Sequence, residues 1–208
     1  MLIDSNKHSR DQIYFLMIQL VIPRPIAWVL SDNGNGGYNL APFSFFNAIT
    51  SNPPILMLSI SWKDENTHKD TWVNIDERKN FVVHIPSSDD VYDVSNSSMV
   101  LPHGVSEIDH FHIGTEAVEG WPLPKVKKAK IAMLCEKYAI YEIGNDPQGL
   151  ILGEIKSFWV DDALVSQNQN RLVIDPAAIK PLARLGGNHY SSLGEILTVQ
   201  RPDKPKET

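Results

Sequence analysis

The sequence predicts a mainly β protein whose strands form an antiparallel barrel or sandwich, with few helices. Six or more apolar runs of strand length are separated by turn-forming residues at hairpin spacing, which is typical of such folds. The chain lacks the alternation of strands with amphipathic helices that a doubly wound parallel sheet requires. Its 208 residues, 42% hydrophobic and 21% charged, are sufficient for a substantial core.

The N-terminal part is expected to contain one helix and a β-hairpin. Residues 9–20 predict a short amphipathic helix, with Ser9 as its N-cap and Asp11 in its first turn. Two strands, at residues 26–30 and 38–43, flank the turn DNGNGG, whose Asn and Gly residues adopt positive φ readily. This turn fits a hairpin better than a phosphate-binding loop.

The next segment predicts a strand and a second helix. Residues 45–49 fit either one helical turn or an edge strand, and residues 55–62 form a strong apolar strand. Thr67 and Asp70 match a capping box, which places the start of an amphipathic helix at Thr67. The side chains expected to face inward from this helix are Trp72, Val73 and Ile75.

The second half of the chain predicts a long β pair preceded by an irregular segment. Residues 87–114 are polar, with short helices expected around 90–95 and 105–111. Gly153 is expected to mark a bulge or a close backbone approach. The predicted strands in this half and just before it cover residues 81–85, 131–143 and 150–160.

The C-terminus is expected to close the domain and then continue as a tail. Residues 193–199 predict a last strand or short helix. We therefore predict a single domain over residues 1–199 and a polar, flexible tail over residues 200–208.

Composition excludes several functional classes. The net charge of −6 and the isoelectric point near 5.6 argue against nucleic acid or an anionic membrane as the main partner. The basic run at 125–130 is short and is expected to be a solvated face. The single cysteine, Cys135, fits a reducing cytoplasm and lies in an apolar run that is typical of a buried, unreactive thiol. No apolar stretch of roughly 20 residues and no secretion signal is found, so we expect a cytoplasmic protein.

Familiar catalytic and metal-binding motifs are absent from the sequence. It contains no GxGxxG after a strand and no GxxxxGK[ST], which argues against a dinucleotide fold and a P-loop. No nucleophile elbow occurs, and we assign no catalytic residue. His84 lies in an apolar strand and is expected to be a core histidine. The group His103, Asp109, His110 and His112 has no spacing that defines a metal geometry, so no metal is expected.

Polar residues recur in the stretch 23–61 where a buried strand would carry apolar ones. Because apolar strands with polar groups near their ends are a usual way to hold a polar small molecule, we interpret this stretch as the wall of a cofactor site. Lys69 near a helix start, together with Arg24, fits an anion site; an ordinary capped surface helix fits equally well. The polar residues of the wall are Arg24, Asn39, Ser44, Ser59 and Ser61.

An ordered set of short motifs resembles the flavin reductase-like family, the FMN-binding split-barrel proteins. The motifs, in chain order, are PRPIAWV, APFSFF, NPP, LSIS, KDTWVNI, FVVHI, LILGEI and RLGGNHY. The resemblance implies a six-stranded antiparallel Greek-key barrel with a few short peripheral helices, usually a homodimer, holding FMN noncovalently near the subunit boundary. It implies hydride transfer from NADH or NADPH to flavin, with a monooxygenase or another electron-transfer protein as partner. Two alternatives are a flavoredoxin-type electron carrier that does not react with NAD(P)H, and a β-barrel binding module without flavin.

The same resemblance assigns site residues by matching position. One group would line the isoalloxazine ring and ribityl chain: Arg24, Asn39, Ala41, Pro42, Phe43 and Ser44. A second group, Ser59, Ile60 and Ser61, would continue that wall, and a third, Lys69, Asp70 and Thr71, would meet the phosphate end. Asp70 is expected to orient its loop through backbone bonds, and Tyr190 to cover the ring. The loop 87–114 is expected to carry specificity.

Overall fold

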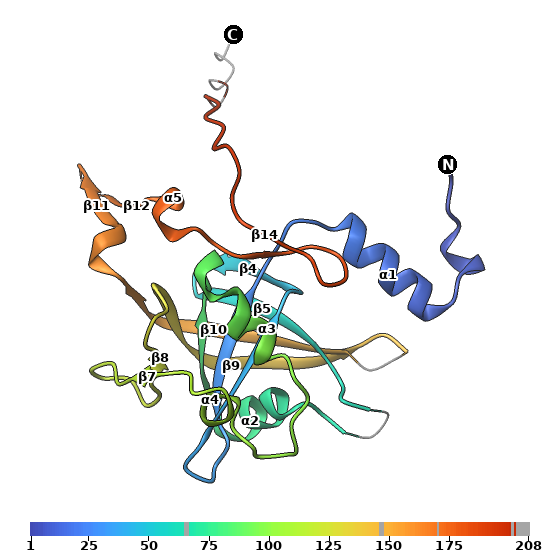
Figure 1. The fold of residues 1–208 in the computed structure, drawn as a ribbon, viewed down its shortest axis with the longest axis horizontal. Coiled ribbons are helices and arrows are strands. Elements are labelled where there is room, and N and C mark those ends of the chain that lie inside the picture. Colours follow the sequence, from blue (N-terminus) through green and yellow to red (C-terminus); the bar gives the residue numbers. More distant parts are fainter. Residues whose placement is uncertain (65–66, 146–147, 170, 201, 203–208) are drawn as a thin grey trace.

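The computed structural model, which describes residues 1–64, 67–145, 148–169, 171–200 and 202, has one central antiparallel sheet (Figure 1). Its strand order is β3-β2-β6-β9-β10-β5-β4. The strands are β2 (Ala27–Asp32), β3 (Tyr38–Phe43), β4 (Phe46–Ser51), β5 (Pro54–Ser61), β6 (Asn80–His84), β9 (Ile131–Ile143) and β10 (Gln148–Val160).

The sheet closes into a barrel because its two outermost strands are joined by a very short link. Only Ser44 and Phe45 lie between β3 and β4, so the sheet must curve until its edges meet. The Ser59 amide donates a hydrogen bond to the Phe45 carbonyl across this link (2.8 Å). The predicted antiparallel barrel is therefore confirmed. The strand count is seven rather than six because the ambiguous residues after Phe45 form the edge strand β4.

Side-chain alternation along the strands builds two cores on opposite faces of the sheet. Ala27 and Val29 of β2 point into the cluster inside the barrel, whereas Trp28 and Leu30 belong to an outer cluster. The outer cluster is covered by the segment between β6 and β9, through residues that include Val94, Ile108 and Val126.

The β2–β3 hairpin and the bulge at Gly153 are as predicted. The Asn33 amide donates to the Gly37 carbonyl (3.0 Å), and Gly34 adopts a φ of 73°. The β9–β10 register shifts at Gly153, and a Cβ added there would lie 2.4 Å from the ring of Phe81. Gly153 is thus both a bulge and a close approach.

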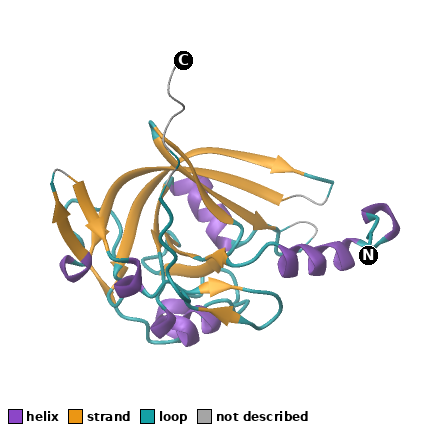
Figure 2. Ribbon diagram, turned by 90° about the horizontal axis from the view of Figure 1, so that it is seen from above, coloured by secondary structure: helices purple, strands orange, loops and turns teal. Residues whose placement is uncertain are grey.

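The first helix, α1 (Arg10–Leu20), begins as predicted. Ser9 and Gln12 form a reciprocal capping box at its N-terminus. Among its residues, however, only Ile18 is buried, and Figure 2 shows α1 projecting sideways from the barrel. The 3-10 turn η1 (Ser5–Lys7) precedes it. No helix in the described parts of the chain combines the length and apolar character needed to cross a bilayer.

The second helix, α2 (Asp70–Arg78), begins later than predicted. The capping box at Thr67 is wrong, because Thr67 pairs with Asp64 in an isolated β-bridge and Lys69 occupies the N-cap position without a side-chain cap bond. The predicted inward-facing side of α2 is correct for Ile75, which is fully buried. Trp72 and Val73 are half-buried.

Two short helices, α3 (Val91–Asn96) and α4 (Glu107–His110), confirm the prediction for the irregular segment. The 3-10 turn η2 (Ser88–Asp90) and the small ribbon of β7 (Thr115–Glu116) and β8 (Lys125–Val126) complete this segment.

The solvated face predicted for residues 125–130 is wrong at Lys125, whose side chain is fully buried. Its ammonium group lies 2.6 Å from a Glu116 carboxylate oxygen and 3.6 Å from the Trp159 ring centroid. It also donates to backbone carbonyls, including that of Lys127 (3.1 Å), so the buried charge is compensated. Lys127 and Lys128 are exposed as expected.

The C-terminal segment returns to the start of the barrel. β1 (Arg24–Pro25) pairs with β13 (Ala183–Arg184), which pairs with β14 (Tyr190–Ser191). The expectation for 193–199 is wrong, because residues 192–200 have no regular structure and are exposed. Of the predicted tail, residues 201 and 203–208 lie outside the described residues. The other elements are η3 (Asp162–Leu164), β11 (Val165–Asn168), β12 (Arg171–Ile174) and α5 (Pro176–Ile179).

Candidate functional site

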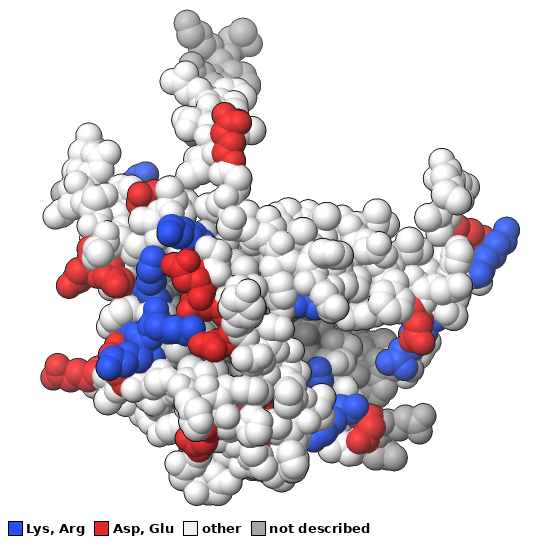
Figure 3. All heavy atoms as spheres, in the orientation of Figure 1, with Lys and Arg blue, Asp and Glu red and all other residues white. Residues whose placement is uncertain are grey.

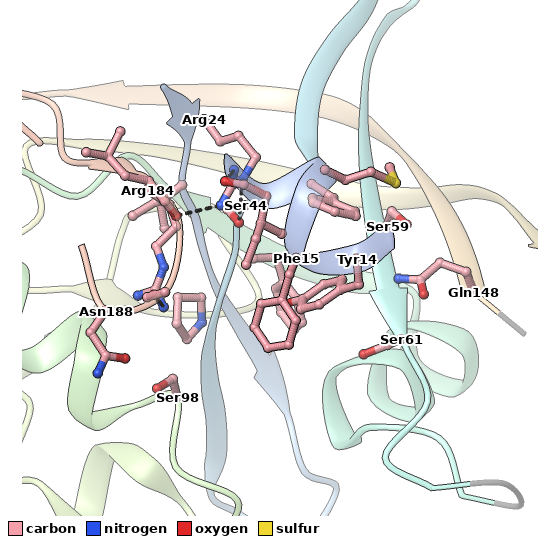
Figure 4. A pocket seen from close by; sticks show the side chains of 18 of the residues that line it. Tyr14, Phe15, Arg24, Ser44, Ser59, Ser61, Ser98, Gln148, Arg184 and Asn188 are labelled. Atoms are coloured by element: carbon pink, nitrogen blue, oxygen red, sulfur yellow. Dashed lines mark hydrogen bonds between the residues drawn. The ribbon is translucent and has the colours of Figure 1, made fainter. Parts of the chain in front are cut away.

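A cavity of about 1100 Å³ lies where the barrel, α1 and the segment 184–190 meet (Figure 4). This volume is at the upper end of, or above, that of usual small-molecule sites. Most of the residues that the sequence assigns to the cofactor line this cavity. They are Arg24, Pro42, Phe43, Ser44, Ser59, Ser61, Lys69 and Tyr190.

The other predicted site residues lie behind the cavity wall. Asn39 and Thr71 are buried, and the Asn39 amide donates to the Thr71 hydroxyl (2.8 Å), which ties β3 to the start of α2. Ile60 is fully buried in the inner core, and Ala41 packs against that core. The structure therefore separates residues that face the cavity from residues that support it.

The Asp70 carboxylate faces away from the cavity, toward the loop after Leu101. One oxygen lies 2.9 Å from Nδ1 of His103, and the other accepts the Gly104 amide (3.3 Å). Asp70 thus fastens the irregular segment to the first turn of α2.

Lys69 is the residue of the cavity wall best suited to an anion. It lies at the N-cap of α2, where helix dipoles favour negative charge, and no carboxylate pairs with it among the described residues. Its ammonium nitrogen lies 6.0 Å from the Phe43 ring centroid. Burial lowers the pKa of Lys69, because a half-buried charge without an opposite charge is disfavoured. A bound anion would compensate it.

Near the start of α2, three aromatic side chains carry nitrogen atoms that have no partner among the described residues. The His68 ring stacks on Trp72 with 3.7 Å between centroids, and the Trp62 ring lies tilted against His68 at 4.2 Å. Nε1 of Trp62, Nδ1 of His68 and Nε1 of Trp72 are buried and form no hydrogen bond within the part of the chain that the structure describes. Orphaned polar atoms of this kind are unusual and are consistent with a ligand near the start of α2.

Arg24 holds the walls of the cavity together. Its guanidinium donates to the carbonyls of Ile18 (2.6 Å), Val21 (2.8 Å) and Leu185 (2.8 Å) and to the Ser44 hydroxyl (3.3 Å). Because most of its N–H groups meet these acceptors, Arg24 acts chiefly as a positioning residue that joins α1, β1 and the 184–190 segment.

Sequence reasoning missed the contribution of α1 and of two other segments. Figure 4 shows Tyr14 and Phe15 of α1 projecting into the cavity. Gln148 and Arg184 also line it. One signal was available: residues 13–18 are apolar on every face of the helix, whereas a helix that packs on one side only has a polar face.

The remaining candidate groups are structural. His84 is fully buried, with Nδ1 2.8 Å from the Trp28 carbonyl and Nε2 accepting the Val126 amide at 3.0 Å, and burial lowers its pKa to about 4. It is a neutral core histidine, as predicted. Cys135 is buried, and burial raises its pKa. Among the described residues, no three His, Cys, Asp or Glu side chains cluster closely enough to hold a metal ion.

Comparison with known proteins identifies the family. The family model described as "Flavin reductase like domain" matches residues 19–179, which is most of the chain. The chain belongs to the flavin reductase-like family. The resemblance found in the sequence motifs is therefore confirmed.

Solved structures of flavin reductase-like proteins share the whole fold. Nitrilotriacetate monooxygenase component B from Bacillus cereus is 32% identical, with a TM-score of 0.88 over 96% of this chain and 98% of that one. The 2-nitrobenzoate 2-nitroreductase of Pseudomonas fluorescens is 27% identical, with a TM-score of 0.87 and coverages of 97% and 96%. A split barrel domain protein from Shewanella frigidimarina, 18% identical, matches with a TM-score of 0.83 over 97% of this chain and 100% of that one. The split-barrel fold is thus confirmed.

Proposed function

We propose that this protein is an FMN-dependent flavin reductase that takes hydride from NADH or NADPH. The observation that supports it most is the cavity at the barrel mouth, in which the half-buried Lys69 has no acidic partner among the described residues. Similarity to a monooxygenase component and to a nitroreductase, at 32% and 27% identity, adds support for a redox role.

The residues at the cavity fit FMN. Lys69 and the first turn of α2 would hold the phosphate, and the hydroxyls of Ser59 and Ser61 would meet the polar ribityl chain. Phe43 and Tyr190 supply the aromatic surface that a flat ring requires. When bound, FMN supplies the hydride-accepting chemistry, and the protein supplies binding and orientation. No acid–base pair is needed for this role.

The remaining space of the cavity suits a second planar substrate. Tyr14 and Phe15 of α1 pack edge to face (5.8 Å between centroids) and present apolar surface opposite the serine-bearing strand β5. Tyr14 (51%) and Phe15 (55%) are exposed in the single chain, so they offer apolar surface for a stacked ring without closing it off from water.

The decisive experiment is the visible spectrum of the purified protein before and after NADH or NADPH is added without oxygen. A yellow, FMN-containing protein that either nucleotide bleaches supports the reductase. A yellow protein that neither nucleotide bleaches refutes it and leaves a flavoredoxin-type electron carrier. A colourless protein that does not quench added FMN fluorescence refutes both.

A monooxygenase-class partner and a homodimer complete the proposal. The match to a monooxygenase component supports a partner that uses the reduced flavin. A second copy of this chain is supported by α1, where Phe15 (55%) and Leu20 (73%) are exposed although the helix is strongly apolar. Light scattering on the purified protein should give twice the mass of the 23.4 kDa chain; the mass of one chain would refute the dimer.

A further inference from the structure

Two arginines are cross-strand partners at one side of the cavity. Arg24 of β1 and Arg184 of β13 are register partners in an antiparallel pair, and both line the cavity. Like charges at such positions are destabilising unless an opposite charge compensates them. Burial, and then the charge of Arg184, lower the pKa of Arg24.

No carboxylate among the described residues compensates this pair. Arg24 is engaged mainly with backbone carbonyls, and neither arginine forms an ion pair among the described residues. Asp11 is the one acidic residue among those that line the cavity, and no described hydrogen bond or ion pair joins it to either guanidinium. The pair therefore leaves a net positive charge at the cavity wall.

Arg184 is held in place but keeps donor capacity. Its guanidinium carbon lies 4.4 Å from the Tyr190 ring centroid, and one Nη donates to the Gly187 carbonyl (2.5 Å). Because a guanidinium has five N–H groups, several of them remain for a ligand. Stacking on Tyr190 orients the planar group, which favours forked recognition of phosphate oxygens.

The cationic groups lie at two separate sides of the cavity. Figure 4 shows Arg184 and Asn188 on one side, and Ser61 with the helix that Lys69 caps on the other. Figure 3 shows Lys and Arg side chains at the rim of the hollow below α1. FMN has a single phosphate, and on the proposed assignment Lys69 binds it. The charge of Arg184 is thus left for a second anion.

We propose that Arg184 binds the phosphate groups of the nicotinamide dinucleotide and so selects this hydride donor over phosphate-free ones. The inference rests on the proposed function, since it concerns the co-substrate of the same cavity. It predicts that loss of Arg184 lowers dinucleotide affinity far more than FMN affinity, which Arg184 influences only through its stacking on Tyr190.

The test compares the FMN-loaded wild type with Arg184→Ala, Arg184→Lys and the control Arg171→Ala, which removes an exposed arginine from β12. NAD⁺ and NADP⁺ are titrated calorimetrically, and anaerobic reduction is followed with NADH, NADPH and the phosphate-free dihydronicotinamide riboside. We expect Arg184→Ala to bind dinucleotides about ten- to one-hundredfold more weakly, the range for loss of a charge-assisted hydrogen bond. Reduction by the riboside and the behaviour of Arg171→Ala should match the wild type, and the FMN dissociation constant should change far less than the dinucleotide affinity. The dinucleotide affinity of Arg184→Lys should lie between those of the wild type and Arg184→Ala.

Several outcomes would overturn the inference. Unchanged dinucleotide affinity in Arg184→Ala is one. An equal loss of reduction rate with the riboside would also overturn the inference, because it would show that Arg184 only shapes its loop. A shifted midpoint potential at unchanged dinucleotide affinity would mean that the guanidinium responds to flavin charge instead. If Arg184→Ala loses affinity for NADP⁺ only, Arg184 contacts the 2′-phosphate. If it loses affinity equally for both nucleotides, Arg184 contacts the pyrophosphate.

Failure of the proposed function has a different signature. In that case the wild type binds FMN but no dinucleotide reduces it. Calorimetric binding of NAD⁺ or NADP⁺ that depends on Arg184 would still support the site, whereas absent binding would overturn it together with the reductase proposal.

Discussion

Replacing Lys69 by alanine should weaken FMN binding without unfolding the barrel. Lys69 is half-buried at the N-cap of α2 and has no acidic partner among the described residues. In the free protein its charge is therefore a cost, because burial already lowers its pKa. Removing it should leave the unfolding free energy of the FMN-free protein unchanged or slightly raised.

The magnitude follows from the exposure of the contact. A hydrogen bond to a charged group contributes roughly 1.5–3 kcal/mol, and solvent screening at a half-buried position places Lys69 at about 1–2 kcal/mol. Since each 1.4 kcal/mol is a factor of ten, the FMN dissociation constant should rise about five- to thirtyfold. The helix dipole remains, so binding should not be abolished.

The assay is quenching of FMN fluorescence on titration with protein, at low and at high ionic strength. Lys127→Ala is the matched control, because it removes an exposed lysine outside the cavity. The affinity difference between wild type and Lys69→Ala should shrink as salt screens the contact. A dissociation constant within twofold of the wild type at low salt would refute the phosphate assignment.

Three further predictions concern stability. Gly153→Ala should cost about 1–3 kcal/mol, because its Cβ would meet the Phe81 ring at 2.4 Å, whereas Gly194→Ala, which meets open space, should cost little; urea unfolding compares them. His84 has a folded pKa of about 4, below its ordinary 6.5, so its contribution is complete above pH 6.5 and is lost as pH falls toward 4, by up to about 3 kcal/mol. A pH series of unfolding free energies in which His84→Gln keeps the full wild-type slope would contradict this. Burial raises the pKa of Glu107 from 4.5 to about 7, so its ionisation opposes folding by an amount that grows as pH rises from 4.5 to about 7 and is complete above that. Glu107→Gln should be about 1–2 kcal/mol more stable than the wild type at pH 8 and equal to it at pH 4, below the ordinary pKa of Glu; a gain that persists at pH 4 would point to another cause.

Elements with local determinants could be predicted from the sequence. The capping box of Ser9, the Asn–Gly hairpin after β2 and the alternating strands all depend on residues close together in the chain. The helix start at Thr67 failed because Thr67 bonds to Asp64 instead, a competing turn that a capping pattern does not reveal. The buried Lys125 failed for a different reason: its compensation by Glu116 and Trp159 depends on contacts between distant segments.

The wall of the cavity was predicted only in part for the same reason. Ser59, Ser61 and Lys69 share the cavity as the motifs suggested, yet Asn39 and Thr71, which belong to the same motifs, face each other behind it. Strand periodicity does not say which side of a closed barrel opens to a ligand, since that depends on where the sheet edges meet.

The order of the motifs along the chain was sufficient to identify the family. The β class and most strand positions could also be predicted, because they depend on local preference and on alternation that a single sequence displays. The walls of the cavity were determined by contacts at long range. Arg24 donates a hydrogen bond to Leu185, which lies 161 residues further along the chain, and so joins this segment to α1. The pairing of β1 with β13 places Arg184 opposite Arg24. The two like charges become neighbours only once β1 and β13, which lie near opposite ends of the chain, have paired.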